Sequence, residues 1–167
     1  MSNGTKVKKR DGRIESLDLE KMHKMVEEAC KGLAGVSASQ VEMTSGIQFY
    51  DGISNEEIQE ILIKSASDLI DLDHPNYQYV AARLLLFAVR KKLYGRMRTL
   101  PHLESHIMNC CNIEVYDKDI FTKYSKEEID KANSYIDHQR DYLIKYAGLR
   151  EVVDKYLVQD ISTGGVY

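Results

Sequence analysis

Residues 6–17 of the chain, KVKKRDGRIESL, determine how the fold begins. Within them Asp11-Gly12 is the strongest signal for a two-residue hairpin turn, because a type I′ turn needs positive φ at both central positions. The stretch therefore predicts a β-hairpin with Val7 and Lys9 on the same face of their strand. Asp18 follows directly and is predicted to cap a helix.

Four helices are predicted between this hairpin and Gly95, because apolar side chains recur there at helical spacing. Ser37 or Ser39 is expected to cap the second helix, and Ser54 forms a capping box with Glu57 at the start of the third. The side chains expected to face the core are Leu19, Met22, Val26, Ala29 and Leu33 in the first helix, Val41, Met43 and Ile47 in the second, and Ile58, Ile61, Leu62, Ala66, Leu69 and Ile70 in the third.

The fourth helix is predicted to run from Pro75 to Gly95. It is apolar almost all round from Val80 to Val89, so we expect it to be the buried centre. Residues 1–95 are therefore predicted to form one small, mainly α domain, a β-hairpin over a four-helix bundle.

Residues 96–167 differ in character and are predicted to begin a second, partial helical domain. Ser125 and Glu128 form another capping box, and residues 134–155 are expected to form one or two more helices. The final stretch, KYLVQDISTGGVY, is predicted to form the two short strands of a β-hairpin. Because a domain rarely ends inside a hairpin, we expect the chain to be the front part of a larger protein.

The composition restricts the classes of function. The 167 residues are 43% hydrophobic and 29% charged, which is typical of a globular protein. A net charge of −3 gives no reason to expect binding to nucleic acid or to a membrane surface, and the longest apolar run, residues 84–89, is too short to span a bilayer. Three cysteines, an odd number, suit a reducing compartment, so a cytoplasmic location is expected.

Lysines from three parts of the sequence are candidates for an anion site. If the hairpin folds over the helices, Lys9, Lys21 and Lys91 can converge on one point. Three ammonium groups would repel one another there unless an anion lay between them, and a polyphosphate is the obvious candidate. The alternative is that these lysines are unrelated and simply solvated.

The histidines and cysteines predict no metal site. His102, His106 and Cys110 are spaced four residues apart, with Cys111 next, so they lie along one stripe of a helix. A single straight helix cannot surround a metal ion tetrahedrally, and we therefore expect a structural role. The sequence also has no GxxxxGK[ST] loop, no GxGxxG after a strand and no GxSxG elbow, so no catalytic residue is predicted.

The stretch VKKRDGRIESLDLEKMHK resembles the ATP-cone, the nucleotide-sensing domain at the front of ribonucleotide reductase large subunits. The family signature is V-x-K-R-[DN]-G-x-x-E-x-[IL]-[ND]-x-x-K-I, and the matching residues are Val7, Lys9, Arg10, Asp11, Gly12, Glu15, Leu17, Asp18, Lys21 and Met22. The resemblance continues through IQFYDGIS, EIQEILIKSASDLI and PNYQYVAARLLLFAVRKKLYG. Beyond these, IDHQRD and KYLVQDISTGGVY are similar to the class Ia large (alpha) subunit in its bacterial and bacteriophage form.

The resemblance implies a set of nucleotide-binding residues. These are Val7, Lys9, Arg10, Glu15, Ser16, Leu17, Asp18, Leu19, Glu20, Lys21, Met22, Asn55, Ile58, Gln59 and Lys91. Val7 and Met22 are implied to enclose the base, and Glu15 and Asp18 to read its edge.

The cations Lys9, Arg10, Lys21 and Lys91 correspond to the family's phosphate contacts, which is the same cluster that charge alone suggests. The chain departs from the family at Asn55, where bacterial members often carry Thr, and at Gln59, where they carry His.

The resemblance also implies the function and the partners. The chain is expected to be the allosteric region of a ribonucleoside-diphosphate reductase that senses ATP or dATP with Mg²⁺, with no prosthetic group of its own. The catalytic barrel and its cysteines would lie after Tyr167, so the chain alone should not reduce ribonucleotides. Implied partners are the rest of the alpha subunit, a second alpha subunit and the radical-generating beta subunit. The alternative is a helical protein-interaction module that binds no nucleotide.

Overall fold

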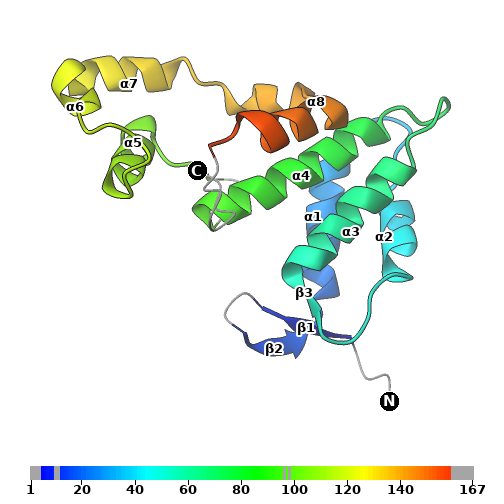
Figure 1. Cartoon of the computed structure of the whole chain (residues 1–167). Coiled ribbons are helices and arrows are strands. Elements are labelled where there is room, and N and C mark those ends of the chain that lie inside the picture. The colour runs from blue at the N-terminus through cyan, green and yellow to red at the C-terminus, as the bar shows by residue number, and fades with distance from the viewer. Residues whose placement is uncertain (1–4, 10–11, 96, 98, 159–167) are drawn as a thin grey trace.

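The computed structural model describes residues 5–9, 12–95, 97 and 99–158 of the chain. The fold is mainly α, as predicted, with a small sheet at its start (Figure 1). Strand β1 (Lys6–Lys8) pairs antiparallel with β2 (Ile14–Ser16) and parallel with β3 (Ile53–Ser54). The sequence did not predict β3, because two residues are too few to show a period. None of the described helices is long and apolar enough to cross a membrane.

The strands on either side of the predicted hairpin turn pair as expected. Lys8 pairs with Ile14, and the N–H of Lys9 donates to the carbonyl of Arg13 at 2.8 Å. The predicted two-residue turn at Asp11-Gly12 falls partly on residues outside the described ones, so it stays a prediction. Gly12 has φ +85°, the positive φ that the predicted turn requires at this position. Asp11 itself lies outside the described residues.

Four helices follow, as predicted. They are α1 (Leu19–Cys30), α2 (Ala38–Gly46), α3 (Asn55–Asp68) and α4 (Tyr77–Tyr94). The carboxylate of Asp18 caps α1 by accepting from the N–H of Lys21 at 3.0 Å, and Ser37 caps α2. Ser54 caps α3 in a complete capping box with Glu57. The predicted caps of these three helices are thus confirmed.

Helix α4 lies at the centre of the main core, with α1, α3 and α8 packed against it (Figure 1). Its residues from Val80 to Phe87 are buried except Arg83, which is half-buried. Gly95 ends the helix in the left-handed conformation, with φ +69°, as the sequence predicted. Pro75 does not start α4, because the helix begins at Tyr77 after Asn76.

Several side chains predicted to face the core are exposed. Leu19, Met43 and Ile47 have exposed fractions of 62%, 74% and 88%. In α2 the buried positions are Val41 and Ser45, four residues apart, so Met43 lies on roughly the opposite side of the helix and Ile47 lies beyond its end.

Leu19 is the first residue of α1 and lies one turn before Met22, where the packed stripe begins. Ile70, also predicted to be in the core, has an exposed fraction of 38% and lies after the end of α3 at Asp68.

The remaining helices form two groups. Helices α5 (Leu103–Asn112), α6 (Ile120–Lys123) and α7 (Lys126–Ser134) extend to one side around a small core (Figure 1). That core consists of Ile107, Cys111 and Ile129. The predicted capping box of Ser125 and Glu128 starts α7 and is confirmed.

The chain then returns to α4 through the 3₁₀ helix η1 (His138–Leu143), helix α8 (Tyr146–Glu151) and the π-helical turn η2 (Val152–Tyr156). The prediction of helix over residues 134–155 is confirmed in kind, but the structure has three short helical elements there where one or two were predicted. The predicted terminal hairpin falls mostly outside the described residues, but its first residues, Lys155 and Tyr156, belong to η2, so the prediction is wrong there.

Candidate nucleotide-binding site

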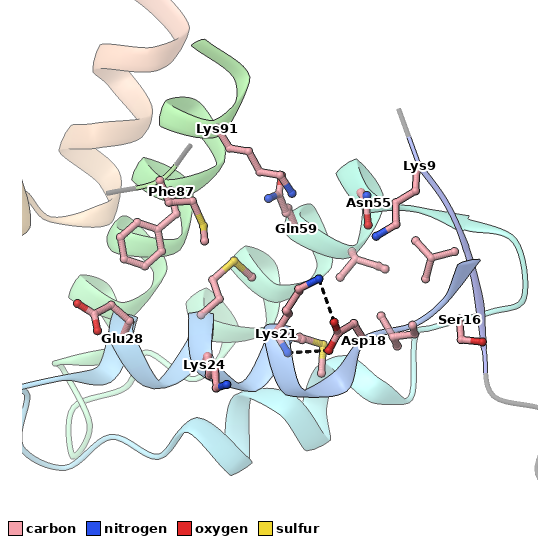
Figure 2. Close-up of a pocket in the computed structure, with 16 residues that line it drawn as sticks. Lys9, Ser16, Asp18, Lys21, Lys24, Glu28, Asn55, Gln59, Phe87 and Lys91 are labelled. Carbon is pink, nitrogen blue, oxygen red and sulfur yellow. Dashed lines mark hydrogen bonds and ion pairs between the residues drawn. The ribbon is translucent and has the colours of Figure 1, made fainter. Parts of the chain in front are cut away.

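A cavity of about 320 Å³ opens between the hairpin, α1, α3 and the C-terminal half of α4 (Figure 2). Its lining mixes apolar side chains with polar and charged ones, and the charged side chains approach from more than one side (Figure 2). The residues that line it are Val7, Lys9, Ser16, Leu17, Asp18, Lys21, Met22, Lys24, Met25, Glu28, Asn55, Ile58, Gln59, Phe87, Lys91 and Met97.

Most of the residues predicted for the nucleotide site line this cavity. They are Val7, Lys9, Ser16, Leu17, Asp18, Lys21, Met22, Asn55, Ile58, Gln59 and Lys91. Three predicted residues, Glu15, Leu19 and Glu20, are not among the lining residues, and Arg10 lies outside the described ones. The structure therefore gathers residues that lie far apart in the sequence, and their role in binding a nucleotide stays a prediction.

Local structure explains how each element contributes. Val7 lies in β1 and Lys9 directly follows this strand, and both line the cavity. The capping box fixes the start of α3, whose first turns present Asn55, Ile58 and Gln59. These positions are three and four residues apart, so they share one face of the helix.

The cations enter the cavity from opposite sides. Figure 2 shows Lys9, the residue after β1, pointing toward Asn55, while Lys91 of α4 points toward Gln59. The Nζ atom of Lys9 lies 3.4 Å from a carboxylate oxygen of Glu15, and that of Lys21 lies 3.2 Å from Asp18. An anion that enters can therefore draw the lysines away from carboxylates of the same chain.

The two predicted base-reading carboxylates have different surroundings. Glu15 lies against Lys9 and Arg13, with 3.5 Å to the guanidinium of Arg13, and does not line the cavity. Asp18 does line it, and the backbone N–H of Lys21, followed by its ammonium, lowers the pKa of the Asp18 carboxyl. An ionised Asp18 can accept a hydrogen bond but cannot donate one.

Sequence reasoning missed part of the apolar lining. Met25, Phe87 and Met97 line the cavity, together with Lys24 and Glu28. Helical spacing could have suggested two of them, because Met25 is three residues after Met22 and Phe87 is four residues before Lys91. The sequence analysis places Phe87 in the expected buried stretch from Val80 to Val89 and predicts no role for Met25.

The histidine and cysteine stripe on α5 serves packing and capping. His102 accepts from the N–H of Glu104, and the Sγ of Cys110 lies 3.8 Å from Nε2 of His106. His102, Glu104 and Asp130 approach one another, but Nζ of Lys126 lies 2.7 Å from Glu104 and 3.5 Å from Asp130. A lysine already supplies the positive charge at this cluster.

The comparison with protein families bears directly on the cavity. The ATP cone domain model matches residues 5–92, which include all but one of the residues that line the cavity. The chain belongs to the ATP-cone family. The one lining residue outside the ATP-cone match is Met97.

This ATP-cone chain is also similar to longer proteins along its whole length. It is 44% identical over 167 residues to the ribonucleoside-diphosphate reductase subunit alpha of Haemophilus influenzae and to the ribonucleoside-diphosphate reductase 1 subunit alpha of Escherichia coli. It is 39% identical over 161 residues to the alpha subunit of Enterobacteria phage T4. Each match covers the chain completely or nearly so. It covers only 22% of the Haemophilus influenzae and Escherichia coli proteins and 21% of the phage T4 protein. The chain thus spans about a fifth of the length of these relatives.

Proposed function

We propose that this chain is the allosteric region of a ribonucleoside-diphosphate reductase alpha subunit and that its cavity binds ATP or dATP. The observation that carries the proposal is the convergence of Lys9, Lys21 and Lys91 on one cavity with an apolar side. A triphosphate needs several cations, whereas a purine needs apolar walls and a few oriented polar groups. The ATP-cone match and the alpha-subunit relatives support this proposal.

Within the cavity, the proposed positions follow from the chemistry of the lining. The base lies between Val7 and Met22, with Asp18 available to accept from the exocyclic amine of adenine. Guanine carries a carbonyl oxygen at that edge, so a carboxylate disfavours it. Asn55 and Gln59 can donate to a phosphate or a ribose hydroxyl, but neither can ionise.

We propose that Mg²⁺ enters with the nucleotide and is held mainly by phosphate oxygens. Among the described lining residues the carboxylates are Asp18 and Glu28. Asp18 already caps α1 and pairs with Lys21. Mg²⁺ in proteins is commonly bound by one or two carboxylates together with substrate phosphates and water, so this lining fits a nucleotide-borne ion.

The proposal places catalysis outside the chain. Reduction of ribonucleotides takes place in the rest of the alpha subunit, with a second alpha subunit and the radical-generating beta subunit as partners, in the cytoplasm. Residues 1–95 form the nucleotide-binding domain, residues 96–167 begin the next domain, and neither holds a prosthetic group. Nucleotide binding here then changes the activity of a distant site.

Equilibrium binding of ATP to the chain tests the proposal. Each charge-assisted contact with a phosphate contributes about 1.5–3 kcal/mol. Lys9→Ala and Lys91→Ala should therefore each weaken ATP binding roughly tenfold or more. Lys123→Ala is the matched control, because Lys123 lies on α6 beside Asp119, away from the cavity. Equal affinities for all three variants, or no binding by the unaltered chain, would contradict the proposal.

A further inference from the structure

Tyr142 of η1 lies beyond the ATP-cone match, yet its ring packs on the central helix of that domain. Its partners are Arg83, Phe87 and Arg90 of α4. These three residues are spaced at i, i+4 and i+7, so they form one stripe along the helix. The guanidinium carbons of Arg83 and Arg90 lie 5.2 and 5.8 Å from the centre of the Tyr142 ring.

Phe87 takes part both in the cavity wall and in the contact with Tyr142. It lines the nucleotide cavity, and its ring also meets the Tyr142 ring edge-on, with the centroids 6.2 Å apart and an angle of 66° between the planes. Such edge-to-face pairs are attractive and have a preferred geometry. Figure 2 shows Phe87 projecting from α4 at the end of the cavity that also holds Glu28. The ring of Tyr142 thus supports one wall of the cavity from outside.

The neighbour of Tyr142 anchors this contact. Asp141 forms an ion pair with Arg90, whose exposed fraction is only 5%, and also lies 3.6 Å from Nδ1 of His138. A buried guanidinium that loses its carboxylate is left with an uncompensated charge, so this pair resists separation. It holds η1 at a fixed place on α4.

Arg83 extends the same contact to the opposite wall. Its Nη1 donates to the carbonyls of Ala29 at 3.0 Å and Lys31 at 2.7 Å, at the C-terminal end of α1. Helix carbonyls there have no partner within the helix, so a cation satisfies them and complements the helix dipole. Helix α1 carries Met22, Met25 and Glu28 of the cavity lining, and Tyr142 therefore contacts side chains that hold both walls.

We propose that Tyr142 is a positioning residue of the nucleotide cavity, and that ATP binding and the docking of residues 138–151 on α4 favour each other. The inference rests on the proposed function, since it names a structural element coupled to that same site. When Tyr142 leaves α4, Phe87 loses the ring that fixes its orientation, and the cavity loses a defined wall. Because coupling between two equilibria is reciprocal, a bound nucleotide that packs on Phe87 must in turn favour the docked segment.

The first test compares ATP affinities by calorimetry. Tyr142→Ala should weaken ATP binding about three- to tenfold, the range expected when one aromatic pair is lost. Tyr142→Phe keeps the ring and should bind within about twofold of the unaltered chain. Tyr135→Ala, at a tyrosine that is 76% exposed, controls for the loss of a ring that has no role in the cavity and should bind ATP normally. Unchanged affinity in a folded Tyr142→Ala variant would overturn the inference.

The second test needs no substitution, so it can test the coupling between ATP binding and the docking of residues 138–151 even if Tyr142→Ala does not fold. Saturating ATP should slow amide hydrogen exchange in residues 138–151 of the unaltered chain, and leave α6 unchanged. ATP binding without any slowing in residues 138–151 would refute the coupling while leaving the proposed function intact. Absence of ATP binding altogether would instead refute the proposed function.

Discussion

The region that carries the cavity and the region of α5–α7 use the same local devices but differ in their cores. Both contain a capping box of Ser and Glu, and both contain lysines paired with carboxylates. Around the cavity, however, α1, α3 and α8 all pack on α4, whereas the buried residues of the other core are Ile107, Cys111 and Ile129. The comparison teaches that converging cations need a stiff frame. Lys9 and Lys21 pair with carboxylates as Lys126 does, but they line one cavity together with Lys91, whereas Lys126 lies on α7, outside that cavity.

The largest expected change in stability comes from removing a buried side chain from one of the two cores. Leu62→Ala removes a fully buried side chain of α3 and should lower the free energy of unfolding by about 2–5 kcal/mol. Ile129→Ala removes a side chain that is also buried, but in the small core. Amide exchange should show faster opening across α3 and α4 for the first variant, and only in α5 and α7 for the second. Equal loss of protection in α4 for both variants would show that the two cores unfold as one unit.

A smaller loss of stability is expected when the same substitution is made in each of the two capping boxes. Ser54→Ala and Ser125→Ala should each cost about 1 kcal/mol of helix stability, because each leaves a backbone N–H without its side-chain acceptor. Only Ser54→Ala should also weaken ATP binding, since Asn55, Ile58 and Gln59 follow it directly. Thermal unfolding and ATP titration of both variants provide the measurement. An equal change in ATP affinity for Ser125→Ala would count against a localised site.

The smallest effect is a pH dependence of opposite sign in the two regions. His23 joins α1 to α2 through Glu42, at 2.9 Å, and this hydrogen bond raises the pKa of His23 above 6.5. Its contribution to stability is therefore complete below pH 6.5 and is lost as the pH rises through the raised pKa. Burial lowers the pKa of His106 on α5, so its contribution is complete above pH 6.5 and is lost as the pH falls through the lowered pKa.

Acidification from pH 8 should thus strengthen the α1–α2 contact and weaken α5. Opening free energies from amide exchange at several pH values would measure both trends. His23→Gln should flatten the first trend alone, and His106→Gln the second alone. The same sign of pH dependence in both regions would show that other groups dominate.

Local chemistry made much of the fold predictable from sequence. The caps at Asp18, Ser54 and Ser125 depend on residues a few positions apart, and each lies where it was predicted. The burial of Met43 and Ile47 was predicted wrongly, because periodicity identifies an apolar stripe but not which arc of a helix its neighbours cover.

The convergence of charged residues around the cavity could be predicted from the sequence, but part of its apolar wall could not. Repulsion between like charges suggested that Lys9, Lys21 and Lys91 meet at an anion, and the structure places them around one cavity. Phe87 and Met97 were missed because a cavity wall and a core position carry the same residue types. The contact between Phe87 and Tyr142 spans 55 positions in the sequence, and no local pattern indicates it.

Ser54 has a consequence for how movement passes through the molecule. It is the last residue of β3, paired with Lys8 of β1, and it is also the residue that caps α3. The sheet and the helix therefore meet at a single residue, with no loop between them to absorb a displacement. We therefore expect a displacement of β3 to move the first turn of α3 as well. Lys9, which directly follows β1, and the first turn of α3, which carries Asn55, are thus expected to shift together when a ligand displaces either one.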